Sequence, residues 1–280
     1  AVNAMIYMRN ITITTAKSAT YLENVGSQVS VQNAMRAAAA LGVTPALRHA
    51  EPGLVVTDFV EGRALRPEDV RDEAILAAWV ERLRALHGGT RAAAGAMTYF
   101  WPFQVARHYL DYCRARPGAH LESLEGLGEV ADALERLAGP YVPVFTHNDV
   151  VPQNAMVDTA GQVHLIDWDY GGFGHPYFDV SGLATNADAD EDVEARVIEL
   201  YEGEVTPDLW RTFRLFKVAV NLREYLWGIA QELSSGLDAE TVGAGMSALY
   251  PDEVPGYSGY AAMNRRRYEA SLAEFRRHHL

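Results

Sequence analysis

Three polar residues in the middle of the chain have the types and spacing needed for chemistry on a phosphoryl group. Asp149 and Asn154 lie five residues apart in HNDVVPQN (147–154), and Asp167 follows thirteen residues later in VHLIDWDYGG (163–172). Phosphoryl transfer from a metal-bound nucleotide needs a carboxylate that takes up the proton of an attacking hydroxyl. It also needs an amide and a second carboxylate that hold Mg²⁺. The three residues match this set, so we predict ATP and Mg²⁺ as cofactors.

The first motif provides the candidate base and one metal ligand. Asp149 is the candidate catalytic base, and Asn154 offers a neutral oxygen ligand for Mg²⁺. A loop can turn both side chains into one cleft, whereas a regular strand would place them on opposite faces. Pro152 stiffens this loop, and His147 is expected to brace it by hydrogen bonds rather than to act in catalysis.

The second motif places two carboxylates at the end of an apolar strand. Asp167 ends the strand and Asp169 follows two residues later. Holding both there is costly unless they share a cation. We therefore predict that Asp167 is the metal ligand that bridges to the nucleotide phosphates. Asp169 is expected near a second metal or a cationic substrate. The alternative for this motif alone is a solvent-exposed turn before Gly171.

Composition limits the kind of partner. The chain has 280 residues, 49% of them hydrophobic and 22% charged, as in soluble globular proteins. Its 24 basic and 37 acidic residues give a formal net charge of −13, which disfavours nucleic acid as a partner. An acidic protein suits a small cationic substrate. The plainer alternative is an acidic surface that keeps the protein in solution.

Three further features bear on the compartment. Cys113 is the only cysteine, so no intrachain disulfide can form and a reducing compartment is expected. No apolar run approaches the roughly 20 residues that cross a bilayer. The first residues, AVNAMIYMRN, lack the basic start and apolar core of a signal peptide. The sequence thus predicts a cytoplasmic protein with no membrane partner.

The remaining pattern indicates an α+β fold with a small β-containing region followed by a mostly helical body. Helices are expected at 31–41, 67–87, 102–115, 121–138, 190–202, 207–233 and 258–277. Strands are expected at 2–15 and 54–62, with short ones at 144–145, 155–157 and 163–166. We expect a nucleotide-binding lobe over residues 1–60 and a helical lobe over 61–280 that carries the catalytic and metal-binding loops.

The two motifs together resemble the aminoglycoside phosphotransferase and choline–ethanolamine kinase family, which has a two-lobed protein-kinase-like fold. HNDVVPQN matches the family's His-x-Asp-x-x-x-x-Asn. LIDWDYGGFGHPYFDV (165–180) matches its Ile-Asp-Trp/Phe-Glu/Asp-Tyr pattern, with the closing Phe-Asp dipeptide at Phe178 and Asp179. VVTDFVEGRAL (55–65) is similar to the hinge between the lobes. REYLWGIAQE and GYSGYAAMNRRRY are similar to carboxy-terminal helices of the choline and ethanolamine kinase branch. The resemblance runs from about Ala34 to the end.

The resemblance assigns the same roles to the base and the two metal ligands, and it adds a place for adenine. It implies that the backbone of Asp58, Phe59 and Val60 contacts the base of ATP. In the choline kinase branch an aromatic cage receives the quaternary ammonium by cation–π attraction.

The positions that match the aromatic cage are Trp227, Tyr170 and Tyr260. Where choline kinases often have a second tryptophan one turn later, this chain has Ala230. The resemblance to the choline and ethanolamine kinase branch implies a small cationic alcohol of the choline or ethanolamine type as substrate.

The amino-terminal region departs from the family pattern. No glycine- or serine-containing phosphate loop is present, and ITITTA (11–16) has threonines where a basic residue would grip the phosphates. Arg9 and Lys17 flank this strand and are the candidates for that role. Gln28 and Gln32 lie near the expected position of the acidic partner, and Glu23 is the only nearby carboxylate.

Three accounts of this departure are open. The chain is a shortened or altered form of an active enzyme, it grips the nucleotide in a divergent way, or it is a pseudokinase-like protein that binds without turnover. We favour activity because the three motif residues keep their spacing. An aminoglycoside kinase is the alternative enzyme, and its acidic substrate groups would be Asp188, Asp190, Glu191 and Asp192. A metal-dependent hydrolase is disfavoured because no second histidine falls at ligand spacing.

Overall fold

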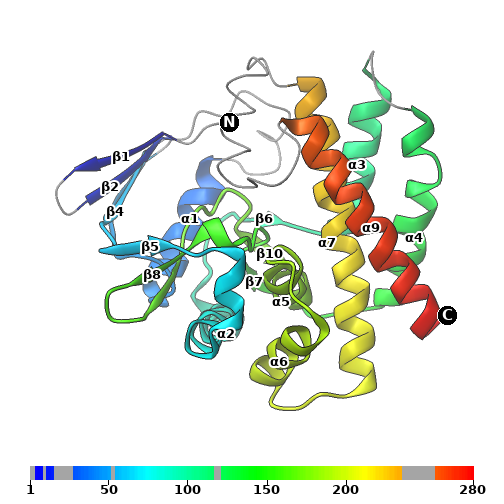
Figure 1. Ribbon diagram of the computed structural model, residues 1–280. Helices are drawn as coiled ribbons and strands as arrows, with labels where there is room; N and C mark the ends of the chain where they lie inside the picture. The colour runs from blue at the N-terminus through cyan, green and yellow to red at the C-terminus, as the bar shows by residue number, and fades with distance from the viewer. Residues whose placement is uncertain (1–3, 9–10, 16–27, 52–53, 117–120, 235–255) are drawn as a thin grey trace. The chain divides into compact units, whose positions relative to one another are not determined.

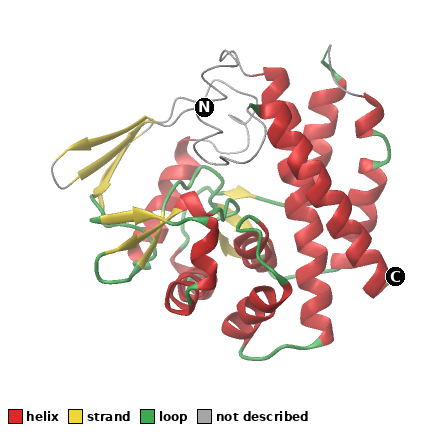
Figure 2. Ribbon diagram, viewed as in Figure 1, coloured by secondary structure: helices red, strands yellow, loops and turns green. Residues whose placement is uncertain are grey.

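The computed structural model describes residues 4–8, 11–15, 28–51, 54–116, 121–234 and 256–280. These form an α+β protein of short strands and mostly helical segments (Figure 2). The chain packs as two compact units, each built from two segments. The first unit is Ala1–Phe100 with Val142–Thr206, and the second is Trp101–Tyr141 with Pro207–Leu280. The boundary expected at residue 60 falls inside the first unit, and a division into 1–60 and 61–280 remains a prediction.

The amino-terminal sheet of the first unit has four antiparallel strands in the order β1-β2-β4-β3 (Figure 1). They are β1 (Ala4–Met8), β2 (Ile11–Thr15), β3 (Leu47–Glu51) and β4 (Leu54–Asp58). The expectation of one strand over residues 2–15 was wrong, because the chain reverses and Met8 pairs with Ile11. Strand β3 was not predicted, since its polar residues give no clear alternation.

Helix α1 (Gln28–Ala40) confirms the helix expected at 31–41, and Gly42 follows it with a positive φ of 67°. Its alanines allow a close approach to the second motif. A Cβ atom on Gly171 would lie 2.9 Å from the Cβ of Ala34, so the loop after Asp169 requires a glycine there.

Two small sheets carry the motif segment. One is antiparallel, in the order β5 (Gly62–Ala64), β8 (Ala155–Asp158) and β9 (Val163–Leu165). The other joins β6 (Thr98–Tyr99), β10 (Gly172–Gly174) and β7 (Val144–Thr146). Strands β6 and β10 were not predicted because they are very short.

Besides α1, the first unit contains the helices α2 (Glu73–Gly88), α5 (Pro176–Thr185) and α6 (Glu191–Glu202). The helix expected at 67–87 is interrupted. Pro67–Arg71 form a 3₁₀ turn, and Asp72 is extended and caps α2 by accepting bonds from the N–H groups of Ala74 and Ile75. Helix α5 was not predicted, because its small and apolar residues show no amphipathic period.

The second unit consists of α3 (Pro102–Arg114), α4 (Leu127–Ala138), α7 (Pro207–Ser234) and α9 (Tyr257–His279). Helix α7 packs on α9 and α3. The helix expected at 121–138 begins as a separate 3₁₀ turn, Leu121–Leu124, because Gly126 has a φ of 73°. Within the described ranges, no helix has the length and apolar character needed to cross a membrane.

Candidate active site

The candidate base and one candidate metal ligand touch each other. The amide nitrogen of Asn154 donates to the carboxylate oxygen Oδ2 of Asp149 at 2.9 Å and to its backbone oxygen at 3.0 Å. The 3₁₀ turn Pro152–Asn154 produces this contact by folding the loop back on itself. The amide nitrogen makes both contacts, so the amide oxygen of Asn154 takes no part in them.

The third residue of the set follows the strand paired with this loop. The ladder of β8 and β9 pairs Ala155 with Leu165, and the N–H of Ile166 donates to the backbone oxygen of Asn154 at 2.9 Å. Asp167 therefore comes directly after a residue that is bonded to Asn154. Its backbone has a positive φ of 62°, a conformation that is uncommon outside glycine. Such strain often marks a functional position.

His147 ties the two motifs together. Its Nε2 bonds the backbone oxygen of Ile166 at 2.9 Å, and its Nδ1 accepts from the N–H of Asp149 at 3.3 Å. The ring is also 4.7 Å from the ring of Trp168. Because a carbonyl only accepts, Nε2 carries the proton and Nδ1 has its lone pair free to accept. Both ring nitrogens are thus used in hydrogen bonds within the loops.

A buried carboxylate fixes the backbone just before the candidate base. Asp179, with 0% of its surface exposed, accepts from the N–H groups of His147 and Asn148, both at 2.7 Å. Asn148 has a φ of 64°, and its side chain donates to the backbone oxygen of Tyr170 at 2.9 Å. The residue that precedes Asp149 is therefore held in the left-handed region from two sides.

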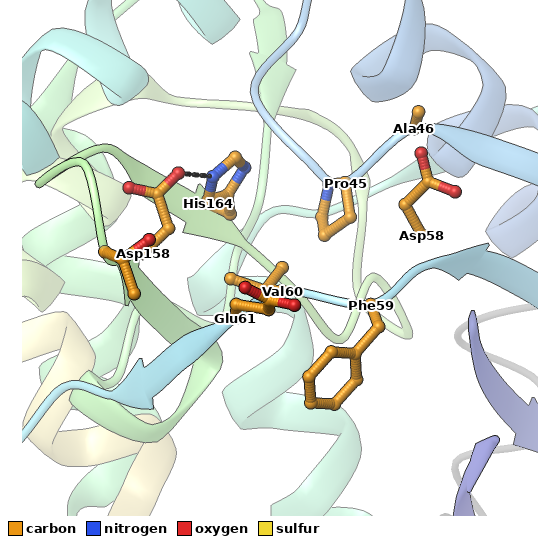
Figure 3. Close-up of a pocket in the computed structure, with 9 residues that line it drawn as sticks. Pro45, Ala46, Asp58, Phe59, Val60, Glu61, Asp158 and His164 are labelled. Atoms are coloured by element: carbon orange, nitrogen blue, oxygen red, sulfur yellow. Dashed lines mark hydrogen bonds and ion pairs between the residues drawn. The ribbon is translucent and has the colours of Figure 1, made fainter. Parts of the chain in front are cut away.

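The segment expected to contact adenine borders an open cavity of about 510 Å³ (Figure 3). Figure 3 shows how the labelled lining residues surround it. The lining residues are Pro45, Ala46, Asp58, Phe59, Val60, Glu61, Asp158, Thr159 and His164. The imidazole of His164 donates to Asp158 and lowers the pKa of that carboxyl. The base and metal-ligand candidates do not line this cavity.

Three charged residues were predicted to bind the nucleotide, namely Asp58, Arg9 and Lys17. The carboxylate of Asp58 is paired with the guanidinium of Arg48 through two hydrogen bonds, of 2.5 and 2.6 Å. Any contact of residue 58 with adenine would therefore use its backbone, as the resemblance implies. Arg9 and Lys17 lie outside the described residues.

The donor set fits magnesium that is shared with a nucleotide. Among the described residues, no three His, Cys, Asp or Glu side chains gather closely enough to form a metal site by themselves. Mg²⁺ is commonly bound by one or two protein oxygens, substrate phosphates and water. The amide oxygen of Asn154 and the carboxylate of Asp167 are oxygen donors of this kind.

Two of the candidate substrate aromatics belong to the second unit. Trp227 on α7 meets Tyr257 and Tyr260 on α9 edge to face, with ring centroids 5.7 and 5.5 Å apart. Tyr260 is buried and its hydroxyl donates to Glu224 at 2.6 Å. Arg223 forms an ion pair with the same carboxylate. Tyr257 and Glu224 were not singled out from the sequence.

The other two candidate substrate residues, Asp169 and Tyr170, belong to the first unit. The ring of Tyr170 meets Phe100 edge to face at 6.0 Å. Of the acidic residues weighed for an aminoglycoside, Asp190 caps α6 by accepting from the N–H of Val193 and pairs with Arg71.

The sequence did not reveal the residues that fix the backbone of the loop carrying Asp149, the candidate base. Asp179 was noted as part of a dipeptide but was given no role, and His87 and Tyr201 were not considered. The available signal was a charged residue within the apolar run of α5, because such a residue is rarely buried without partners.

The match to a family model identifies the chain as a phosphotransferase. The model of the phosphotransferase enzyme family matches residues 23–216, which is more than half of the chain. The chain belongs to this family.

Individual relatives are distant. Protein LicA of Haemophilus influenzae is 23% identical over 172 residues, which cover 60% of this chain and 63% of LicA. The match thus spans less than two thirds of that relative's length.

Solved structures share the fold. A choline/ethanolamine kinase family protein from Mesorhizobium loti has a TM-score of 0.75 at 23% identity, covering 99% of this chain and 88% of its own. Choline kinase LicA from Streptococcus pneumoniae has a TM-score of 0.72 at 18% identity, covering 97% and 89%. The GDP complex of an aminoglycoside 2'-phosphotransferase-IIIa variant scores 0.61 at 14% identity, covering 95% and 86%. At these identities the likeness shows the fold alone.

Proposed function

We propose that this protein transfers the γ-phosphoryl group of ATP, with Mg²⁺, to the hydroxyl of a small cationic alcohol of the choline or ethanolamine type. The observation that carries the proposal is the contact between Asn154 and Asp149, next to the strand pairing that leads into Asp167. The base candidate and one candidate metal ligand are therefore in contact, and the second candidate ligand directly follows a residue that is bonded to the first.

Asp149 acts as the base in this proposal. Its carboxylate accepts a hydrogen bond from the alcohol, orients the oxygen towards the phosphorus and takes up the proton as the new bond forms. The N–H donated by Asn154 fixes the orientation of this carboxylate.

Asn154 and Asp167 would hold the metal. Bound Mg²⁺ supplies charge neutralisation and orientation of the phosphate groups. The chain's own contribution is to keep the two oxygen donors at fixed places, which the β8–β9 ladder and the bond of His147 to Ile166 support.

The cationic acceptor is inferred from the aromatic residues and the acidic charge. Trp227 and Tyr257 are partly exposed rings of the kind that attract a quaternary ammonium, and the buried Tyr260 packs edge to face against Trp227. Choline and ethanolamine kinase names among the structural neighbours agree with this class.

A panel of acceptors tests the proposal against its alternative. Amino alcohols, sugars and aminoglycosides are each incubated with the protein, ATP and Mg²⁺, and the release of ADP is followed. We expect release with choline-type or ethanolamine-type alcohols. Release with aminoglycosides alone would favour an antibiotic kinase, which the fold of the aminoglycoside phosphotransferase neighbour also allows.

No release with any acceptor, together with no calorimetric heat at millimolar ATP and Mg²⁺, would favour a binding protein that has lost the reaction. A Trp227→Ala variant separates the acceptor assignment from the chemistry. Its KM for the cationic alcohol should rise about tenfold or more, since cation–π contacts are worth roughly 1–2 kcal/mol. Trp210→Ala on the same helix is the matched control, because Trp210 packs against Arg214 and Phe213 instead.

A further inference from the structure

A chain of hydrogen bonds leads from helix α6 to the backbone beside the candidate base. The hydroxyl of Tyr201 is 2.7 Å from Nδ1 of His87 on α2, and Nε2 of His87 is 3.1 Å from Oδ2 of Asp179 on α5. The two oxygens of Asp179 accept from the N–H groups of His147 and Asn148 at 2.7 Å. His87 and Asp179 are buried, so the bond between them and the bonds of Asp179 to the backbone are screened from water, and the bond of Tyr201 to His87 is partly buried.

The direction of each bond follows from what the groups can donate. Backbone N–H groups only donate, so both oxygens of Asp179 act as acceptors. An ionised Asp179 also accepts from Nε2–H of His87. In the neutral imidazole this leaves Nδ1 as an acceptor, and the O–H of Tyr201 is its donor. The tyrosine hydroxyl thereby supports the tautomer that Asp179 requires, in which His87 donates from Nε2.

The hydrogen-bond chain ends at a residue with an uncommon backbone conformation. Asn148, with its φ of 64°, comes directly before Asp149. Asparagine adopts the left-handed region more readily than most residues, but that region is still less populated than the right-handed ones, so outside bonds help to keep Asn148 there. The bond from Asn148 N–H to Asp179 is one of these. If one of these hydrogen bonds is lost, the backbone at Asn148 should relax and turn Asp149 away from its working orientation.

We propose that Tyr201 is a positioning residue for the proposed phosphoryl transfer, acting through His87 and Asp179 on the backbone that carries Asp149. This inference rests on the proposed function. Burial raises the pKa of Tyr201 above its usual value, so the hydroxyl keeps its proton and remains a donor throughout the working pH range.

The test compares two tyrosines. Tyr201→Phe removes the hydroxyl from the chain and leaves the ring. Tyr177→Phe is the matched control, because the hydroxyl of Tyr177 donates to Glu202 at 2.9 Å and its ring lies edge-on to Tyr201 at 6.2 Å. Both variants remove one partly buried hydroxyl from neighbouring rings, but only one of these hydroxyls belongs to the chain.

The first readout is hydrogen exchange, which needs no turnover. The amides of His147 and Asn148 should exchange about tenfold faster in Tyr201→Phe, since about 1.4 kcal/mol of local stabilisation corresponds to that factor. In Tyr177→Phe their exchange should match the wild type. Equal exchange in all three proteins would overturn the proposal.

The second readout is kinetic. In Tyr201→Phe, kcat should fall about tenfold while KM for ATP and for the alcohol stays within about twofold, as expected when an interaction of the transition state alone is lost. A matching fall in Tyr177→Phe, or an unchanged kcat in Tyr201→Phe, would contradict the positioning role.

A double variant checks that the effect passes through His87. His87→Phe removes both the donor for Asp179 and the acceptor for Tyr201, so Tyr201→Phe should then change amide exchange no further. Additive effects of the two substitutions would contradict the proposed route. If the wild type shows no kinase activity while amide exchange behaves as expected, the proposed function fails and the hydrogen-bond chain stands.

Discussion

At the scale of single residues, the proposed mechanism depends on the small number of atoms that hold the candidate base in place. Asn154 has two tasks, because its amide nitrogen holds Asp149 and its amide oxygen is a proposed metal ligand. One substitution therefore reports on both.

We expect Asn154→Ala to raise the Mg²⁺ concentration needed for half-maximal activity by about 10- to 100-fold, as the loss of a group at a metal site does. The control is Gln153→Ala, which changes the adjacent residue of the same turn. Activity is measured across a Mg²⁺ titration at saturating ATP. Identical Mg²⁺ dependence in the two variants would count against a metal role for Asn154.

His175 gives a residue-level prediction on stability. Burial, and then the nearby His87, lower the pKa of His175 to about 4. In the unfolded chain the imidazole titrates near 6.5. Between these values the unfolded chain binds more protons than the folded one, so stability falls as the pH drops from 6.5 to 4. The loss for this one group is at most roughly 3 kcal/mol.

The variant His175→Asn tests this dependence. The histidine's Nδ1 accepts from the N–H of Tyr177 at the start of α5, and asparagine can take over that capping bond without titrating. Chemical denaturation at several pH values should show a shallower loss of unfolding free energy in the variant over that window. Parallel curves would show that His175 does not contribute.

At the scale of helices and strands, the strongest packing constraint in the second unit is where α7 meets α9. A Cβ atom added to Gly228 would lie 3.0 Å from the Cα, Cβ and N atoms of Ala261, so the backbones approach closely. These atoms of Ala261 cannot move aside as the end of a flexible side chain would.

Gly228→Val should therefore lower the free energy of unfolding by about 1–3 kcal/mol or more, the usual cost of overpacking. Gly88→Ala is the control, because it lies in helix α2 with no atom within 4 Å of the added carbon. We expect that variant to be neutral or slightly stabilised. Thermal unfolding compares them, and equal midpoints would mean that the helices separate at little cost.

Much of the fold could be predicted from helix periodicity and end signals. Long helices such as α3 and α7 were found nearly to the residue, since Pro102 and Pro207 mark their starts. What was missed depends on tertiary pairing. Strand β10 is two glycines around Phe173, and Gly172 is needed because a Cβ there would lie 2.1 Å from the backbone oxygen of Thr98. No local pattern encodes such a partner.

For the candidate site, too, local spacing could be predicted from the sequence and tertiary contacts could not. Asp149, Asn154 and Asp167 were chosen from spacing, and the structure brings the first two into contact. His87 and Tyr201 could not be found that way, since each is an ordinary residue on its own helix. Their significance comes from the buried carboxylate of Asp179, which α5 places between them and the loop.

At the scale of the whole molecule, the formal net charge of −13 should favour the approach of a cation. We expect kcat/KM for a quaternary amino alcohol to fall as ionic strength rises from about 0.05 to 0.5 M, because salt shortens the range of this attraction. For a neutral alcohol with measurable turnover the fall should be smaller. The same salt dependence for both would exclude long-range attraction as a source of specificity.

The most direct measurement of the central claim is the transfer of labelled phosphate from ATP to choline or ethanolamine, with Mg²⁺, by the wild type and by Asp149→Asn. Calorimetry with ATP checks that the variant still binds nucleotide, and Asp111→Asn on an exposed part of α3 serves as the control. The account predicts a labelled phosphoester from the wild type and the control. It predicts at least about 100-fold slower formation in Asp149→Asn, the usual contribution of a positioned base. Equal rates in the wild type and Asp149→Asn would contradict the account.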